Sequence, residues 1–177
     1  LYADHFPYRQ VETARNVRQS PIHDRLKGEG ACFGEVSGWE RANWFLPKAE
    51  HDAGKPAEYE YSWKRQNWFD HSADEHNAVR NPVGMFDLSS FGKIRVVGKD
   101  AEAVLQRLCG NDVAVPDGKI VYTQFLNEDG HIEADVTVTR LSYDEFLVVT
   151  PAATVRRDLH WINGHIPDGA HCFAMDV

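Results

Sequence analysis

The chain has 177 residues, of which 19 are basic and 27 acidic, so its formal net charge at pH 7 is −8. This excess of acidic residues argues against a nucleic-acid-binding protein, which normally carries a basic face. Hydrophobic residues make up 42% of the chain and charged residues 26%, values that are typical of folded domains and exclude wholesale disorder. No apolar run reaches the roughly 18–20 residues that cross a bilayer, so we expect no membrane association.

The cysteines and the two ends of the chain carry further information. Cys32, Cys109 and Cys172 are odd in number and far apart, a pattern that fits free thiols in a reducing compartment better than a disulfide framework. We therefore expect a cytoplasmic protein, or a mitochondrial matrix protein in a eukaryote. The chain begins at Leu1 rather than Met and closes on an alternating stretch over 171–177. We expect it to be an internal piece of a longer protein.

Residues 1–67 are rich in aromatic residues and show few periodic stretches, which predicts an irregular connector. Within this region the sequence WERANWF at 39–45 is echoed by WKRQNWF at 63–69, and the two copies hold four of the five tryptophans. Two copies do not make a solenoid, which needs at least three stacked units. The aromatic residues fit anchors that fix extended segments onto a core. Alternatively, the Trp and Arg side chains lie at an inter-domain or ligand surface, where both types are enriched.

The remainder of the chain is regular. A capping-box pattern at 72–75 predicts the start of a helix that ends near Arg80, because Pro82 follows. Alternation, helical spacing and turn residues then predict a strand, a helix, a hairpin with a third strand, a second helix and a closing strand. The expected ranges of these elements are 92–97, 101–108, 119–127, 131–141, 145–150, 151–164 and 171–177. This order predicts an α+β domain with a largely antiparallel sheet and crossover helices.

One polar strand face is the most informative feature of this region. The second strand of the expected hairpin carries apolar residues on one face and Glu133, Asp135, Thr137 and Thr139 on the other. Aspartate is depleted in strands, so Asp135 requires an explanation. Its surroundings fit either a solvated sheet face or a polar cavity in which a carboxylate takes a proton or binds an amine. Tyr122, on the partner strand, can reach the same face, although a structural cross-strand tyrosine fits its position as well.

Patterns that bind metals or nucleotides are weak in this sequence. Two histidine pairs, His71 with His76 and His160 with His165, are five residues apart, which does not align two imidazoles on a helix as i,i+4 spacing does. Paired cysteines are absent as well, so no metal site is expected. The glycines of residues 27–34 lack the preceding strand and the G-x-G-x-x-G spacing of a dinucleotide site. The chain shows neither a P-loop nor a nucleophile elbow.

An ordered series of motifs resembles the folate-binding aminomethyltransferase family, whose best-known member is the T-protein of the glycine cleavage system. The motifs are EHNAVR at 75–80, VGMFDLS at 83–89, CGNDV at 109–113, VYTQFLN at 121–127 and DGHIEAD at 129–135. Residues 20–45 are similar to the connector joined to such a domain in FAD-dependent dimethylglycine and sarcosine dehydrogenases. The resemblance implies a connector over 1–67 and a truncated N-terminal part of the folate-binding domain over 68–177.

The resemblance also implies roles for four residues. Asp135 matches the aspartate that contacts the folate amine and promotes its attack on the one-carbon unit, and Tyr122 matches a tyrosine that lines the folate pocket. Val148 and Thr150 match the strand whose end meets the pterin, where T-proteins usually carry an asparagine. T-proteins also carry two adjacent acids at the aspartate position, whereas here Ala134 precedes Asp135. Which acid corresponds is therefore open.

The resemblance implies a parent enzyme in which FAD, bound mainly outside this chain, oxidises an N-methylated glycine derivative such as dimethylglycine or sarcosine. This chain would form the region that passes the released one-carbon unit to tetrahydrofolate. The isolated piece would be inactive, because a missing flavin domain and a missing C-terminal folate domain complete the two sites. The alternative is a non-catalytic folate-binding or interaction module that keeps the aminomethyltransferase fold.

Overall fold

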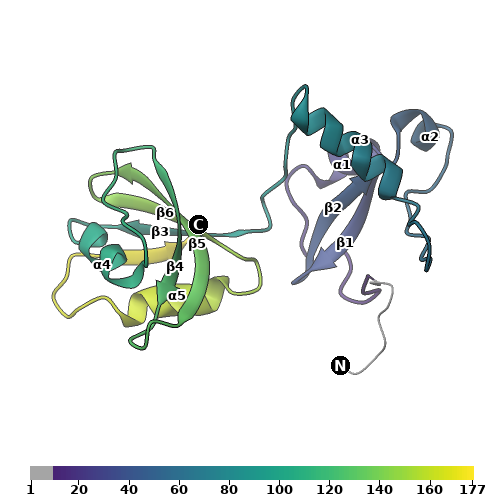
Figure 1. Ribbon diagram of the computed structural model, residues 1–177. Coiled ribbons are helices and arrows are strands. Elements are labelled where there is room, and N and C mark those ends of the chain that lie inside the picture. The colour runs from purple at the N-terminus through teal and green to yellow at the C-terminus, as the bar shows by residue number, and fades with distance from the viewer. Residues whose placement is uncertain (1–9) are drawn as a thin grey trace. The chain divides into compact units, whose positions relative to one another are not determined.

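The computed structural model describes residues 10–177, and the chain forms two compact units that divide between Ser90 and Phe91 (Figure 1). A two-stranded sheet belongs to the first unit and a five-stranded sheet to the second. The division falls after the boundary at 67/68 that the resemblance implies. The helix over 69–80 belongs to the first unit, because its contacts are with the strand over 39–45.

The first unit contains a β-hairpin and short helices. Its elements are α1 (His23–Gly28), β1 (Ala31–Val36), β2 (Trp39–Phe45), α2 (Lys48–Asp52) and α3 (Phe69–Arg80). Between the antiparallel strands β1 and β2, Ser37 and Gly38 both have positive φ (53° and 83°), as a two-residue type I′ turn requires. The expectation of an irregular segment is therefore wrong for residues 23–52.

The aromatic residues of the first unit build its small core. Trp44 and Leu46 are buried together with Cys32, and Trp68 packs against them. The two sequence copies at 39–45 and 63–69 do not form a structural repeat, because the first is strand β2 and the second leads into helix α3. Trp44 fits the interpretation as a core anchor, whereas Trp63 is 79% exposed.

Helix α3 differs from its prediction at one end only. It begins at Phe69, three residues before the capping-box serine, Ser72, and its N-terminus carries no side-chain cap. It ends at Arg80 as predicted, with Asn81 as its C-cap, and Pro82, which has no N–H to donate, cannot continue the helix. The expected cap misled because the sequence S-x-x-E occurs here inside the helix rather than at its start.

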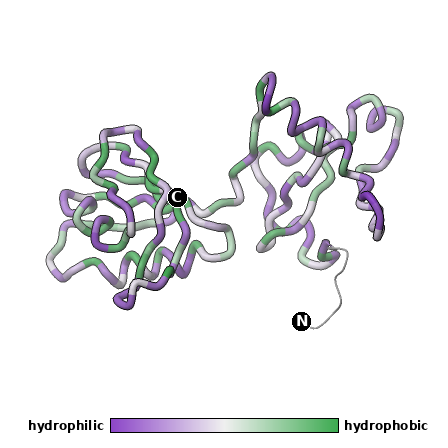
Figure 2. The backbone as a smooth tube through the Cα atoms, viewed as in Figure 1, coloured by the Kyte–Doolittle hydropathy of each residue, from purple (hydrophilic) through white to green (hydrophobic). Residues whose placement is uncertain are grey.

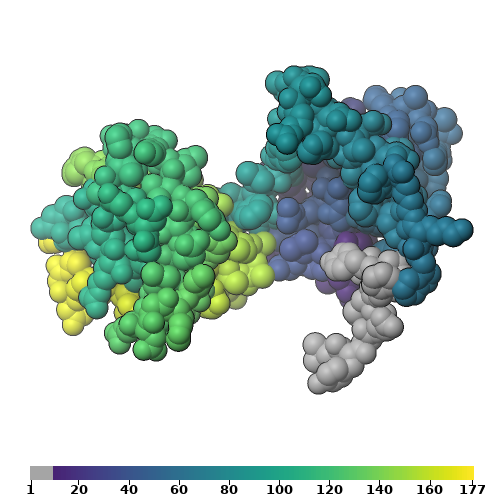
Figure 3. Space-filling model, viewed as in Figure 1, coloured from purple at the N-terminus to yellow at the C-terminus, as the bar shows by residue number. Residues whose placement is uncertain are grey.

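Two side chains attach α3 to β2. The carboxylate of Glu75 accepts the backbone N–H of Phe45 at 2.7 Å, so this glutamate ties the two elements together instead of capping its own helix. His71 stacks on the indole of Trp44, with ring centroids 5.3 Å apart and an interplanar angle of 7°. In the space-filling view, α3 and the segment that follows it (teal) lie at the surface of the first unit (Figure 3).

The second unit confirms the predicted order of elements. They are β3 (Gly92–Val97), α4 (Ala101–Leu108), β4 (Ile120–Leu126), β5 (Ile132–Ser142), β6 (Glu145–Thr150), α5 (Val155–Gly164) and β7 (Phe173–Asp176). The strands lie in the order β4-β5-β6-β3-β7, and every neighbouring pair is antiparallel. The predicted α+β fold with a mainly antiparallel sheet is therefore confirmed.

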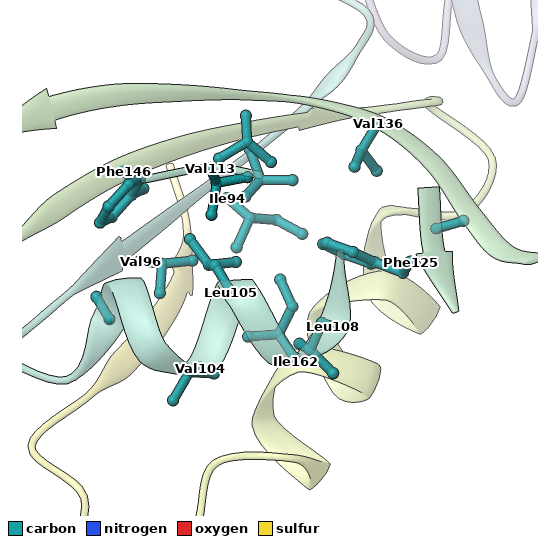
Figure 4. Close-up of a cluster of buried hydrophobic side chains, with 14 of the residues drawn as sticks. Ile94, Val96, Val104, Leu105, Leu108, Val113, Phe125, Val136, Phe146 and Ile162 are labelled. Atoms are coloured by element: carbon teal, nitrogen blue, oxygen red, sulfur yellow. The ribbon is translucent and has the colours of Figure 1, made fainter. Parts of the chain in front are cut away.

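Both helices of the second unit pack on the same face of this sheet (Figure 4). Leu105 of α4 and Ile162 of α5 are fully buried against Ile94, Val138 and Phe146 of the strands. Because successive strand residues point to opposite faces, the second face carries the alternate residues, and within the described residues neither helix covers it. Hydrophobic and hydrophilic residues are interspersed along the backbone of this unit (Figure 2).

Candidate functional site

The β4–β5 hairpin positions the site residues. Its turn is closed by the side chain of Asn127, whose Oδ1 accepts the backbone N–H of His131 at 2.9 Å, and by Gly130 at φ 77°. This turn sets the pairing of the two strands, in which Gln124 lies directly opposite Asp135. Tyr122 lies two residues before Gln124 on β4 and so on the same face of the sheet. Diagonal cross-strand neighbours are within reach of an aromatic side chain, so the register brings the phenol to the carboxylate.

Two side chains of the edge strand β4 hold the Asp135 carboxylate. The Tyr122 hydroxyl donates a hydrogen bond to Asp135 Oδ2 at 2.9 Å, and Gln124 Nε2 donates one to Asp135 Oδ1 at 3.0 Å. Each carboxylate oxygen therefore has one fixed donor. Asp135 is exposed and Tyr122 is 62% exposed, so the group lies on the uncovered face of the sheet.

This arrangement constrains what Asp135 can do chemically. An ionised carboxylate has about four lone-pair sites, of which Tyr122 and Gln124 use two, so others remain to accept an N–H from a ligand. The pKa of Tyr122 is raised above its ordinary value, first because its hydroxyl donates to Asp135. The phenol therefore remains a hydrogen-bond donor at neutral pH and orients the carboxylate.

The second acid of the strand, Glu133, has a different environment. Its Oε1 accepts a hydrogen bond from Asn127 Nδ2 at 3.0 Å, and its backbone oxygen accepts one from Arg157 of α5. Glu133 also lies at the bulge where the β4–β5 register shifts. The structure thus ties Glu133 to the turn and to α5, and leaves Asp135 as the acid beside the aromatic ring.

Residues 22–177 match the model of the GCVT N-terminal domain. The chain belongs to this family. The crystal structure of glycine cleavage system aminomethyltransferase T from Bartonella henselae matches the fold with a TM-score of 0.70 at 22% sequence identity. That match covers 91% of this chain and 38% of the other.

Three curated relatives are much longer than this chain. The chain is 51% identical over 157 residues to 4-methylaminobutanoate oxidase (formaldehyde-forming) of Paenarthrobacter nicotinovorans, covering 89% of this chain and 18% of that protein. Human mitochondrial sarcosine dehydrogenase is 35% identical, with coverages of 80% and 17%. The mouse mitochondrial pyruvate dehydrogenase phosphatase regulatory subunit is 32% identical, with coverages of 100% and 20%. The chain therefore spans about a fifth of the length of these relatives.

Of the four predicted site residues, this GCVT-family chain brings two together. Tyr122 and Asp135 share the uncovered face, whereas Val148 and Thr150 lie on the opposite face of the sheet. Val148 is fully buried in the hydrophobic core, and Thr150 is fully buried with its hydroxyl donating to Asp158 of α5. Their side chains therefore do not reach the Tyr122–Asp135 face, because residues 148 and 150 point to the same buried face of β6 as Phe146.

Gln124 is the site residue that the sequence reasoning missed. Its signal was present, because Tyr122 and Gln124 are two residues apart on one strand and so share a face. The sequence did not show which residue of β4 lies opposite Asp135, because this pairing depends on where the turn at Asn127 closes the hairpin.

Residues 10–177 contain neither a candidate metal centre nor a candidate membrane-spanning helix. Within that range, no group of three or more His, Cys, Asp or Glu side chains has the geometry to hold a metal ion. No helix in that range is long and apolar enough to cross a membrane. Cys32, Cys109 and Cys172 are free thiols, and burial raises the pKa of Cys109 to about 12.

Proposed function

We propose that this chain is part of the one-carbon-transfer region of an enzyme that oxidises an N-methylated amino acid, with tetrahydrofolate as the one-carbon acceptor. Family membership supports this proposal, as do the oxidase and dehydrogenase names of two relatives. The observation that carries it is the Asp135 carboxylate, held by Tyr122 and Gln124 on an open sheet face.

Asp135 is the hydrogen-bond acceptor for the amine of bound tetrahydrofolate. Tetrahydrofolate, when bound, supplies the amine nitrogen that takes up the one-carbon unit. Asp135 accepts an N–H of that amine through a free lone pair, which orients the nitrogen and gives its proton a place to go. Tyr122 and Gln124 keep the carboxylate in one rotamer, and the exposed ring of Tyr122 offers a flat apolar surface for a planar pterin.

The residues present fit only part of such a site. Asp135 and Tyr122 provide one acceptor and one aromatic wall, and any role of Val148 and Thr150 must run through the backbone at the end of β6. We propose that a C-terminal folate domain completes the pocket. FAD would bind to a flavin domain outside this chain and act on dimethylglycine, sarcosine or a related amine.

A calorimetric titration of the intact protein with tetrahydrofolate tests the binding part of the proposal. We expect saturable binding that weakens by about tenfold in Asp135→Asn, since this variant loses a charge-assisted hydrogen bond. Asp74→Asn, an identical change at an exposed position of α3, is the matched control and should leave the affinity unchanged. Undetectable binding by the wild-type protein would refute the proposal.

One relative favours a second candidate function. The mouse regulatory subunit matches the whole chain, and its name describes regulation rather than catalysis. A module that binds folate or a partner without transferring a one-carbon unit would keep the same fold. A folate-binding module of this kind would bind tetrahydrofolate in the titration above and yet form no one-carbon product in the presence of an N-methylated amine, whereas a module that binds only a partner would do neither.

A further inference from the structure

The first unit contains a cavity of about 520 Å³ that the proposed folate chemistry does not use. It lies between β2, α3 and residues 84–90, all within the unit that ends at Ser90. Its apolar wall includes Phe45, Val79, Met85 and Phe86. This size and this lining are typical of small-molecule sites, which are mostly apolar with a few polar groups that fix the ligand.

One of those polar groups is the Glu75 carboxylate. Glu75 Oε1 accepts the Phe45 N–H, and among residues 10–177 no cationic group lies within ion-pair distance of this carboxylate. Burial raises the pKa of Glu75, while the Phe45 N–H and the nearby His71 act in the opposite direction, so the charged form is only partly compensated in this position. A partly buried carboxylate is costly unless a positive charge accompanies it.

The other charges at the cavity leave an excess of negative charge. The Glu40 carboxylate is already neutralised by a bidentate pair with Arg15, at 2.8 and 2.7 Å. Of the remaining charged side chains in the wall, Glu75 and Asp87 are negative and Arg41 is positive, with His76 counted as neutral. The balance therefore lacks one positive charge.

A second, independent feature is an unpaired hydroxyl in the cavity wall. Ser90 is 6% exposed, and its Oγ has no hydrogen-bond partner among the described residues. Ser90 also lines the cavity. Buried hydroxyls are nearly always hydrogen-bonded in native proteins, so this one requires an explanation, and a polar ligand in the cavity supplies it.

We propose that this cavity binds a small organic ammonium ion. Glu75 takes its positive charge, Ser90 Oγ accepts one of its N–H groups, and its alkyl part packs on Val79, Met85 and Phe86. An organic cation fits better than Ca²⁺ or Mg²⁺, because those ions need about six oxygen ligands, whereas this wall is largely apolar and aromatic. The site lies in the first unit and does not rest on the folate proposal.

Calorimetric titration of the full chain with butylammonium tests this inference, with butanol and butyrate as neutral and anionic probes of the same length. We expect only butylammonium to bind. In Glu75→Gln, which keeps an oxygen for the Phe45 N–H, the affinity should fall by about tenfold, and in Ser90→Ala by a smaller factor. The matched control is Glu29→Gln, at the exposed C-cap position that follows α1 and outside the cavity, which should bind like the wild type.

Three outcomes would overturn the inference, and the first two need only the wild-type chain, so they do not depend on a variant folding correctly. Binding of butanol as tight as that of butylammonium would exclude charge recognition. Undetectable butylammonium binding up to about 10 mM would exclude the site. Equal butylammonium affinities of the wild type and Glu75→Gln, with amide spectra that show the variant to be folded, would show that Glu75 does not hold the ligand. Loss of tetrahydrofolate binding would leave all three of these outcomes unaffected.

Discussion

At the scale of single residues, the pairing of Tyr122 with Asp135 has a measurable signature. The phenol donates to the carboxylate at 2.9 Å, and this hydrogen bond raises the pKa of Tyr122. Because the pKa of Tyr122 is higher in the folded than in the unfolded state, this hydrogen bond contributes its full stabilisation below the ordinary tyrosine pKa of about 10. It is lost as the pH rises through the raised value.

We predict that Asp135→Asn lowers the pKa of Tyr122 back toward its ordinary value, because the acceptor loses its negative charge. A titration of the assigned Tyr122 ring signals by NMR measures this directly. Glu133→Gln is the matched control, since Glu133 lies on the same strand but bonds to Asn127. An identical Tyr122 titration in the wild type and in Asp135→Asn would mean that the hydrogen bond does not form in solution.

At the scale of elements, a single glycine between β3 and α4 allows the chain to pass close to the backbone of the segment before β7. Gly98 has φ 129°, and a Cβ atom there would lie 2.0 Å from the backbone oxygen of His171. Its N–H also donates to the Asp144 backbone oxygen at 2.8 Å. Both the conformation and the close backbone approach require glycine at this position.

We predict that Gly98→Ala destabilises the second unit by about 3 kcal/mol, because the strain of the backbone adds to a clash with backbone atoms that cannot move independently. Gly118→Ala is the control, since Gly118 also has a positive φ (81°) but open space around it, and should cost only about 1 kcal/mol. Urea unfolding compares the two variants. Equal costs would contradict the role assigned to the His171 contact.

Local sequence signals predicted some elements well and others poorly. Strands such as β3 and the β4–β5 hairpin were predictable, because alternation and the Asp129-Gly130 turn both act over a few residues. The start of α3 and the position of Glu75 were not, because the partner of Glu75 is the Phe45 amide, 30 residues away. The cavity of the first unit likewise depends on long-range packing that no local pattern encodes.

The candidate site shows the same limit. Strand alternation and pairing indicated Asp135 and Tyr122 independently of the resemblance, and the structure joins them by a hydrogen bond. Val148 and Thr150 came from the resemblance only, and the parity of β6 directs both side chains into the buried layer beside α4 and α5. The sequence predicts that Phe146, Val148 and Thr150 share one face of β6, because they alternate with Leu147 and Val149.

At the scale of the whole molecule, residues 10–177 form two separate hydrophobic cores. Trp44 and Leu46 belong to the core of the first unit, and Leu105 and Ile162 to that of the second. Each unit therefore has its own source of stability, and a defect in one core should be felt mainly in that unit.

We predict that Leu105→Ala destabilises the second unit by about 2–5 kcal/mol and leaves the first unit protected, because the cavity forms in one core only. Hydrogen exchange followed by mass spectrometry resolves peptides from both units. Leu141→Ala, at a position 44% exposed, is the control and should change stability by less than about 0.5 kcal/mol. Equal loss of protection in β1–β2 and in β4–β5 peptides would show that the two units unfold as one.

The most direct test of the proposed one-carbon chemistry compares two rates in the intact protein, oxidation of the N-methylated amine and formation of methylenetetrahydrofolate. In Asp135→Asn we expect product formation to fall by about a hundredfold while amine oxidation is unchanged, so that the one-carbon unit is released as formaldehyde. Asp74→Asn should leave both rates unchanged. If Asp135→Asn also leaves both rates unchanged, Asp135 does not assist the transfer and the proposed chemistry is wrong.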